Sequence, residues 1–441
     1  MAQLSDDCFA FGGELITTAA ALADLEARIE TVAEIETAAL PAALGRILAE
    51  DIVAARDVPP NPNSAVDGYA VYFDDLDEGK PTVLPVVGRA AAGHPLDGFQ
   101  ARGTAVRIFT GAPMPRGGSD KSGGGPDTVM MQEDCIEREG PGGAAMVEIA
   151  AGIKRGANQR EAGEDVRAGD TILRAGQRLR PQDLGLAASV GRASLSVYAP
   201  LRAAVFSTGD EVRDPLDMSE RNADGGDGAL GAGLIYDSNR VTIAALLAQL
   251  GCAVSDLGIL PDDQPTIEAA LAEAARDHAL IVTSGGMSVG DEDHVRAAVE
   301  ALGQVHFWRL AIKPGRPIAL GQIGHVPFVG LPGNPVAVMV TFLRIARPMI
   351  LKLAGASDTG PQLFPVRAGF DHKKKKDRRE WVRVRIAPGG DGVPVAHKFP
   401  RDGAGILTSM VEADGLVELP EDMTRLEAGA MVDFLPFSEV S

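Results

Sequence analysis

The 441-residue chain has only three cysteines, few aromatic residues and no excess of positive charge. Cys8, Cys135 and Cys252 stand far apart in the sequence, so neither a disulfide framework nor a cysteine-based zinc site is expected. Such sparse cysteine fits a reducing cytoplasm, and the first residues show no signal-peptide pattern. Apolar stretches break off before the roughly 18–20 residues that a membrane span requires. We therefore expect a cytoplasmic protein that does not bind a membrane.

The formal net charge is −19 at pH 7, and this excess of acidic residues restricts the classes of ligand. Nucleic acids and membrane surfaces bind basic faces, so neither is expected as a partner. The chain as a whole would repel an anionic ligand. Such a ligand needs a local device, such as converging backbone N–H groups beside one or two cations.

The sequence divides into four regions that differ in their pattern of apolar residues and of turn-forming Gly and Pro. We predict a mixed α/β domain at 14–56 plus 152–199, an inserted β domain at 57–151, an α/β domain at 200–355 and a C-terminal β domain at 356–441. Apolar spacing predicts a helix within 14–50, followed by a second short helix that includes Leu44 and Leu48. The Gly-rich stretches 116–127 and 219–233 are interpreted as loop insertions without chemistry.

Strand and helix patterns alternate between residues 200 and 353, which predicts a parallel, doubly wound sheet. The expected strands are Ala203–Ser207, Ala253–Ile259, Leu280–Thr283, Val305–Leu310, Ile318–Leu320 and Phe328–Val329. The expected helices are Ser238–Leu250, Gln264–His278, Asp293–Leu302 and Pro335–Leu353. The C-terminal region has short strands instead, with the basic run Lys373–Lys376 interpreted as a solvated hairpin tip.

The unusual residues of the α/β domain follow its strands, where parallel sheets bind their ligands. The segments that we expect to meet at this edge are 208–211, 237–240, 284–288, 313–317 and 331–335. Glycines after Ser284 allow successive N–H groups to point at one anion. Asn334 and Pro335 suit the start of a helix, whose N-terminus attracts negative charge. Lys313 and Arg316 add full positive charges, so we predict an anion-binding enzyme site.

Carboxylates are expected at the same edge from Glu211, Asp237, Asp291 and Asp293. Carboxylates beside cations suggest a phosphate or another oxoanion together with Mg²⁺. Taken singly, each of these loops is more often a plain turn or a helix cap than a site. The sequence contains neither a P-loop nor a dinucleotide-binding glycine pattern, so it lacks the signatures of an ATPase and of a dinucleotide-binding enzyme.

Several motifs in the order of one family extend this prediction to nearly the whole chain. They are SAVDGYA (64–70), RIFTGAPMP (107–115), GEDV (163–166), STGDEV (207–212), DSNR (237–240), TSGGMSVGDEDH (283–294), IKPGRP (312–317) and LPGNPVA (331–337). With these motifs the chain resembles the molybdopterin molybdenumtransferase family, the MoeA proteins, from about residue 14 to 435.

The resemblance implies an elongated homodimer of four-domain subunits, in which the α/β domain is similar to the molybdopterin adenylyltransferases and the C-terminal domain is a small β-barrel. It implies that the enzyme takes adenylylated molybdopterin, cleaves its pyrophosphate bond with loss of AMP, and ligates molybdate in the presence of Mg²⁺. The active cleft would be shared between subunits. Molybdopterin adenylyltransferase and client molybdoenzymes are the expected protein partners.

The resemblance and the loop chemistry together predict the site residues. The expected catalytic carboxylates are Asp67, Glu211, Asp237 and Asp293, with Glu211 and Asp237 as ligands of Mg²⁺. The expected substrate-binding residues are Thr110, Asp165, Ser284, Gly285, Gly286, Ser288, Lys313, Arg316, Pro332, Gly333, Asn334 and Pro335. By the resemblance, Asp67 and Thr110 reach across from the partner subunit, and Asp237→Ala is expected to stop turnover without unfolding the chain.

Three positions depart from the family pattern. Ala337 and Ala404 stand where the family often has serine, and Arg316 stands where many members have lysine. Serine at both positions would help to hold molybdate, so their replacement points to an altered oxoanion site. Two alternatives stay open at this point: a non-catalytic molybdopterin-binding or scaffold protein, and a paralogue specialised for tungstate or for one client enzyme.

Overall fold

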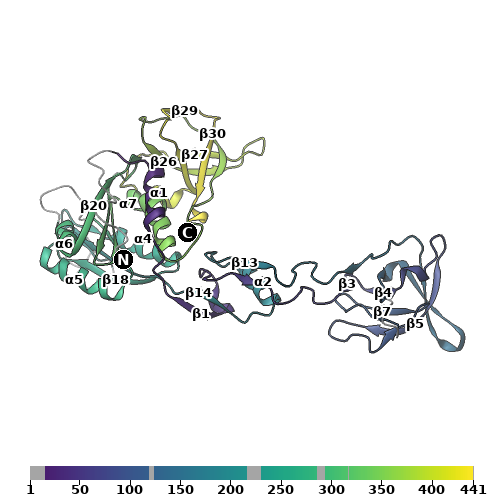
Figure 1. Ribbon diagram of the computed structural model, residues 1–441. Coiled ribbons are helices and arrows are strands. Elements are labelled where there is room, and N and C mark those ends of the chain that lie inside the picture. Colours follow the sequence, from purple (N-terminus) through teal and green to yellow (C-terminus); the bar gives the residue numbers. More distant parts are fainter. Residues whose placement is uncertain (1–14, 119–123, 216–229, 286–293, 316, 441) are drawn as a thin grey trace.

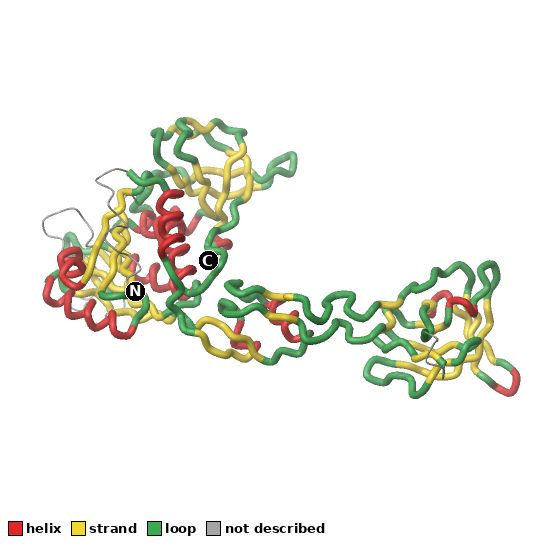
Figure 2. The backbone as a smooth tube through the Cα atoms, in the orientation of Figure 1, coloured by secondary structure: helices red, strands yellow, loops and turns green. Residues whose placement is uncertain are grey.

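The computed structural model describes residues 15–118, 124–215, 230–285, 294–315 and 317–440. The molecule is elongated, with an inserted β domain at one end and two packed domains at the other (Figure 1). A narrow middle region joins the two ends through two passages of chain. One passage leads out to the inserted domain and the other leads back, as the backbone tube shows (Figure 2).

The α/β domain is built on a six-stranded sheet in the order β18-β15-β19-β23-β22-β20. These strands are Ala253–Leu260 (β18), Arg202–Thr208 (β15), Leu280–Ser284 (β19), Val326–Leu331 (β23), Pro317–Ile323 (β22) and Gly303–Arg309 (β20). The predicted α/β class is confirmed, but the expectation of a wholly parallel sheet is wrong at β22, which is antiparallel to both neighbours. Gly324 and His325 alone join β22 to β23, and a connection of two residues permits only an antiparallel hairpin.

Helices cover both faces of this sheet, because successive side chains of each strand point to opposite sides. Val205 and Val282 pack with α4 (Ser238–Gln249) in one cluster. Phe206 and Ile281 pack with α5 (Gln264–Asp277) and α6 (His294–Leu302) in the other cluster.

The helix predicted over Pro335–Leu353 is present but irregular. It begins as α7 (Pro335–Thr341), passes through a π-helical turn at Phe342–Ala346 and ends as α8 (Arg347–Leu353). Pro348 lies in the first turn of α8 and has no N–H to donate to the preceding turn, which accounts for the widened segment.

The N-terminal prediction of a helix within 14–50 is only partly correct. Helix α1 spans Thr18–Arg28 and packs with α8 in the main core, but Ile35–Ala39 form strand β1, which pairs with β14 (Ser194–Tyr198). The predicted second helix is a 3-10 turn at Leu40–Ala43, after which Ile47 and Leu48 form strand bridges. The β14 partner, distant in sequence, outweighs the local helical spacing.

The middle region consists of short paired strands around one helix. The elements are β2 (Ile52–Val53) with β13 (Thr171–Leu173), β3 (Asn63–Ser64) with β12 (Gln159–Arg160), and α2 (Pro181–Ser189). The Pro-rich segment around Pro59 is extended, and a bridge between Val58 and Val166 ties it to the returning passage. Both passages therefore support each other between the two ends of the molecule.

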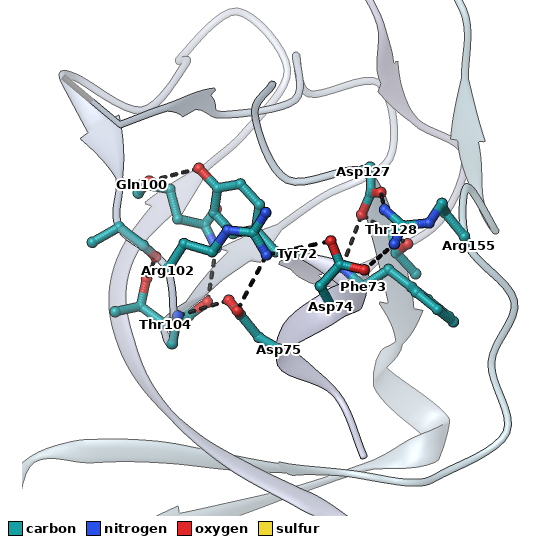
Figure 3. A network of polar contacts seen from close by, with 12 residues as sticks. Tyr72, Phe73, Asp74, Asp75, Gln100, Arg102, Thr104, Asp127, Thr128 and Arg155 are labelled. Carbon is teal, nitrogen blue, oxygen red and sulfur yellow. Dashed lines mark hydrogen bonds and ion pairs between the residues drawn. The ribbon is translucent and has the colours of Figure 1, made fainter. Parts of the chain in front are cut away.

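The inserted domain contains a six-stranded sheet in the order β10-β11-β5-β7-β4-β9. Its strands are Cys135–Glu139 (β10), Ala145–Ile149 (β11), Thr82–Ala90 (β5), Ala105–Ile108 (β7), Gly68–Val71 (β4) and Thr128–Met131 (β9). A polar network fixes the loops beyond β4, with Arg155 between Asp74 and Asp127 and Arg102 against Tyr72 (Figure 3).

The C-terminal domain is a closed barrel of five strands, which confirms the expected small β-barrel. The strands are Arg379–Ala387 (β26), Val395–Lys398 (β27), Phe364–Ala368 (β24), Met431–Pro436 (β30) and Gly415–Leu419 (β28), and β28 returns to pair with β26. The interpretation of Lys373–Lys376 as a solvated tip is wrong for Lys374. That side chain is buried and donates to the carbonyl oxygens of Pro420 and Met423. Within the described ranges, no helix combines the length and the apolar character needed to cross a membrane.

Gly68 occupies a position that no other residue fits, since a Cβ there would lie 1.8 Å from the carbonyl oxygen of Met130 on β9. We expect Gly68→Ala to destabilise the inserted domain by about 3 kcal/mol, because the clash is with the backbone of the neighbouring strand β9, not with a flexible side chain. Calorimetry and limited proteolysis would measure the loss. The control is Gly185→Ala in α2, where a Cβ meets nothing within 4 Å and a gain of up to about 1 kcal/mol is expected. Equal stabilities of the two variants would contradict this account.

Candidate active site between the sheet edge and the barrel

A cleft of about 540 Å³ lies where the carboxyl ends of the sheet strands face the barrel. The α/β domain contributes Gly285, Lys313, Pro314, Gly315, Leu331, Pro332, Gly333, Asn334 and Ala337. The barrel contributes His372, Glu380, Trp381, Val382, Arg383, Lys398, Phe399, Asp402, Gly403 and Ala404. Several of the loops predicted to converge therefore do converge, and the barrel supplies an opposite wall.

Ser284 and Asn239 hold three loops of the sheet edge together. The buried Ser284 hydroxyl donates to the carbonyl oxygen of Pro332 at 3.0 Å and accepts from the amide of Asn239 at 2.9 Å. Asn239 also donates to the carbonyl oxygen of Gly333 at 2.7 Å. Gly285 follows with φ +86°, a left-handed conformation that favours glycine, and its N–H donates to the carbonyl oxygen of Leu331 at 3.3 Å. The expected convergence of successive N–H groups involves Gly286, which lies outside the described residues.

The start of α7 also faces the cleft, but one of its N–H groups is already used. Asn334 is the N-cap residue and Pro335 the first helical residue, as expected, and the Asn334 side chain makes no capping bond. The Val336 N–H donates to the carbonyl oxygen of Ala404 in the barrel at 2.9 Å. The barrel thus caps the helix in part and leaves the Asn334 amide at the cleft.

Lys313 reaches the cleft from a strand that joins the two domains. Strand β21 (Ile312–Lys313) pairs in parallel with β26 of the barrel, which places Lys313 directly opposite Glu380. Gly315 has φ +94°, and a Cβ there would lie 2.7 Å from Thr341 Cγ2 on α7. Only glycine therefore allows the loop after Lys313 to pass this closely over the helix.

Glu380 is a buried carboxylate surrounded by cationic and proton-bearing groups. Arg378 Nε donates to Glu380 Oε1 at 2.7 Å, and His372 Nε2 lies 3.0 Å from Oε2. Burial raises the pKa of Glu380, but the bonds from His372 and Arg378 and the charges of Lys313 and Arg378 outweigh it, so the pKa falls to about 2. Glu380 is therefore ionised at every physiological pH.

Arg383 is a cleft residue that sequence reasoning missed. It lies on β26 and is 8% exposed, with NH1 donating to Gly403 and NH2 to Arg401. Its Nε has no hydrogen-bond partner among the described residues, and burial lowers the pKa of the guanidinium despite the charge of Asp402. The alternation in WVRVRI was a usable signal, because it places Trp381 and Arg383 on the same face of the strand.

Asp237 occupies a different environment from the one expected of a metal ligand. It is 5% exposed, and Oδ1 accepts the Arg240 N–H at the start of α4, while Oδ2 accepts from Arg240 Nε and from the Ser207 hydroxyl. Arg240 also pairs with Asp214 and Asp256. In this structure Asp237 caps a helix and balances a buried arginine, so Asp237→Ala should also lower stability.

The remaining predicted carboxylates do not form a metal centre in the described part of the chain. Glu211 is exposed, and no group of three or more His, Cys, Asp or Glu side chains is arranged there to hold a metal ion. Five of the predicted residues lie outside the described residues, namely Gly286, Ser288, Asp291, Asp293 and Arg316.

Asp67 and Thr110 lie together, but in the inserted domain at the far end of the same chain (Figure 1). Asp67 Oδ1 accepts from the Thr110 N–H at 2.7 Å and from its hydroxyl at 2.8 Å, and these bonds lower the pKa of Asp67. Asp165 lies in the middle region, where its N–H donates to Val58. None of the three lines the cleft of its own chain.

Comparison with known proteins defines first the class and then the family. Residues 16–191 match the MoeA N-terminal region (domain I and II), residues 204–352 a "Probable molybdopterin binding domain", and residues 365–437 the MoeA C-terminal region (domain IV). The molecule is thus a multidomain protein built around a domain of the molybdopterin-binding class.

Relatives over nearly the full length identify the family. A molybdopterin molybdenumtransferase of Haemophilus influenzae is 37% identical over 402 residues, covering 91% of this chain and 93% of the relative. Molybdopterin molybdenumtransferase 2 of Mycobacterium tuberculosis is 32% identical over 405 residues, covering 90% of this chain and 93% of the relative. A crystal structure of the molybdopterin biosynthesis MoeA protein from Pyrococcus horikoshii has a TM-score of 0.78 at 26% identity, covering 96% of this chain and 100% of that one. The chain belongs to the molybdopterin molybdenumtransferase family, a family of transferases.

Glu380 gives a prediction on the pH dependence of stability. Its pKa in the folded chain, about 2, lies below the ordinary 4.5, so its contribution is complete above pH 4.5 and is lost as the pH falls toward 2. The shift corresponds to about 3 kcal/mol. Urea unfolding between neutral pH and about pH 3.5 should show a shallower acid loss of the free energy of unfolding in Glu380→Gln than in wild type. Parallel curves for the two proteins would contradict the assignment.

Proposed function

We propose that the protein ligates molybdate to the dithiolene of adenylylated molybdopterin, with cleavage of the pyrophosphate bond and release of AMP. Family membership supports the overall reaction, and the relatives' names supply molybdopterin and molybdenum. The proposal rests on the cleft between the sheet edge and the barrel, where the cationic residues Lys313, Arg383 and Lys398 line one space.

Two anions have complementary positions in this cleft. The phosphate end of the pterin suits the start of α7 beside the turn at Ser284 and Gly285, because the helix dipole attracts negative charge there. Molybdate is a tetrahedral dianion and suits Lys313; Arg316, the second predicted cation, lies outside the described residues. Arg383 is a further candidate, because a buried guanidinium with an unused N–H is strongly attracted to an oxoanion.

The two alanines that replace the family's frequent serines both line this cleft. Ala337 lies on the first turn of α7 and Ala404 in the barrel loop that caps it. Two hydroxyl donors are therefore replaced by methyl groups on facing walls. We propose that Lys313 and Arg383 provide a larger share of the oxoanion binding in this chain than in its serine-containing relatives.

Mg²⁺ remains an expected cofactor of the proposed reaction. The described residues do not form its site, since both carboxylate oxygens of Asp237 accept hydrogen bonds from Arg240 or Ser207. Glu211 is exposed and could accept a metal that arrives with the substrate's phosphates. A cytoplasmic location is likewise kept as a prediction.

We further propose a homodimer in which Asp67 and Thr110 of one subunit face the cleft of the other. The support is geometric, because this pair is preorganised and accessible to solvent, with Asp67 partly buried and Thr110 exposed, but is separated from its own cleft by the middle region (Figure 1). A pair that serves a neighbouring subunit needs this combination of exposure, fixed geometry and distance from its own cleft.

The proposed reaction is tested with purified protein, adenylylated molybdopterin, molybdate and Mg²⁺ by measuring AMP. We expect Lys313→Met to lower kcat/KM for molybdate by at least about tenfold, the size typical of a lost hydrogen bond to a charged group. Lys376→Met is the control, because that lysine is exposed on the barrel and does not line the cleft. Wild-type protein that neither binds the adenylylated pterin nor releases AMP would overturn the proposal. Replacing molybdate by tungstate in the same assay tests the specialised-paralogue alternative.

The shared site is tested by combining two defective subunits. Asp67→Asn and Lys313→Met homodimers should each be nearly inactive. A mixed dimer purified through two different tags should recover about half the wild-type rate, because one of its two symmetry-related clefts is intact. An inactive mixed dimer, or a wild-type protein that is monomeric by light scattering at assay concentration, would exclude the shared arrangement.

A further inference from the structure

The Lys313 ammonium group is held by a carboxylate that belongs to the barrel. Nζ of Lys313 lies 3.5 Å from Glu380 Oε2, and the two residues are directly opposite in the parallel pairing of β21 with β26. The side chain of Lys313 is 48% exposed, whereas that of Glu380 is 2% exposed. A partly exposed cation at the wall of the cleft is thus paired with a buried anion.

This ion pair reduces the entropy cost that lysine usually has when it binds an anion. A free lysine side chain loses much of its rotamer entropy when it is fixed. A carboxylate that restrains the ammonium group before the ligand arrives removes part of this cost from binding, which is the effect of preorganisation. An unshared carboxylate would, however, also cancel the charge that attracts the anion.

The surroundings of Glu380 prevent that cancellation. Arg378 and His372 both bind its carboxylate, so Lys313 is not its only partner. Lys374 on the same hairpin adds positive charge, and Asp402, another carboxylate that lines the cleft, is paired with Lys398. Lys313 and Arg378 carry two positive charges against the one negative charge of Glu380, so the three side chains keep one net positive charge.

We infer that Glu380 is a positioning residue, which acts on the oxoanion only through Lys313. The inference rests on the proposed function for the identity of the oxoanion, but not for the contact itself. Glu380 holds the ammonium group at the cleft wall, and Arg378 and His372 hold Glu380 ionised and in place. Its contribution should therefore vanish when Lys313 is absent.

The test is a double-mutant cycle of molybdate binding to the full-length protein, measured by isothermal titration calorimetry. We expect Lys313→Met to weaken binding at least tenfold and Glu380→Gln about fivefold. The double variant should bind as weakly as Lys313→Met alone. Glu380→Asp should recover part of the affinity, since it restores the charge on a shorter side chain. Additive losses in the double variant, or unchanged affinity in Glu380→Gln, would overturn the inference.

A matched control separates positioning from general loss of stability. Glu418 is a second buried carboxylate of the barrel, bound by Arg344, Arg379 and the Trp381 indole, but it does not line the cleft. Glu418→Gln should leave molybdate affinity within about twofold of wild type. If Glu418→Gln weakens binding as much as Glu380→Gln does, the effect belongs to barrel stability and the inference is wrong.

A second measurement does not depend on molybdate. Acetylation of Lys313 by acetic anhydride, followed by mass spectrometry, should be severalfold faster in Glu380→Gln than in wild type, with Lys376 as internal reference. An unchanged rate would contradict the positioning role. A faster rate in Glu380→Gln, with no molybdate binding by wild type, would keep the contact and reject the proposed oxoanion.

Discussion

The candidate site depends on the parallel pairing of two residues from the α/β domain with strand β26 of the barrel. Ile312 and Lys313 pair with Arg379 and Glu380, and the Arg379 N–H donates to Ala311. A few such bonds contribute only about 1 kcal/mol each. The larger contribution comes from the core, because Trp381 of the barrel is buried in the same hydrophobic cluster as the sheet and its helices. The cleft therefore lies between two domains that share one hydrophobic core, and both of its walls are fixed before any ligand binds.

The negative net charge of the chain explains why its anion site must lie between two packed domains. A protein with a net charge of −19 repels dianions at long range, so it must hold cations where partial burial weakens screening by solvent. Burial of an arginine is itself costly and lowers the pKa of Arg383 and of Arg344. Each of these cations is supported by oxygen partners: carbonyl groups in the case of Arg383, and Glu418 in the case of Arg344. Oxygen partners of this kind let a strongly acidic protein maintain a local anion site.

Sequence reasoning located one wall of the cleft but, apart from Ala404, did not identify the residues of the other. The sheet edge was predictable, because alternating strands and helices place every strand-end loop on the same side. Ser284, Lys313 and Asn334 all contribute to this region. The barrel wall was not predictable in the same way, since short antiparallel strands carry no rule for which face meets another domain. Arg383 was missed for that reason. For Asp237 the position at the sheet edge was predictable from the sequence. Its hydrogen bonds with Arg240 and Ser207 were not, because they depend on the folded arrangement.

The middle region restricts which cleft Asp67 can reach. Its two passages are bonded to each other, with the Val58 N–H donating to Val166 and the Asp165 N–H to Val58, and prolines stiffen the outgoing one. A stiff, paired connection cannot fold back far enough for Asp67 to reach the cleft of its own chain. The same stiffness would hold Asp67 and Thr110 at a defined distance and orientation for a second subunit. The rigid separation of Asp67 from the cleft of its own chain is thus also what a shared site between two chains would require.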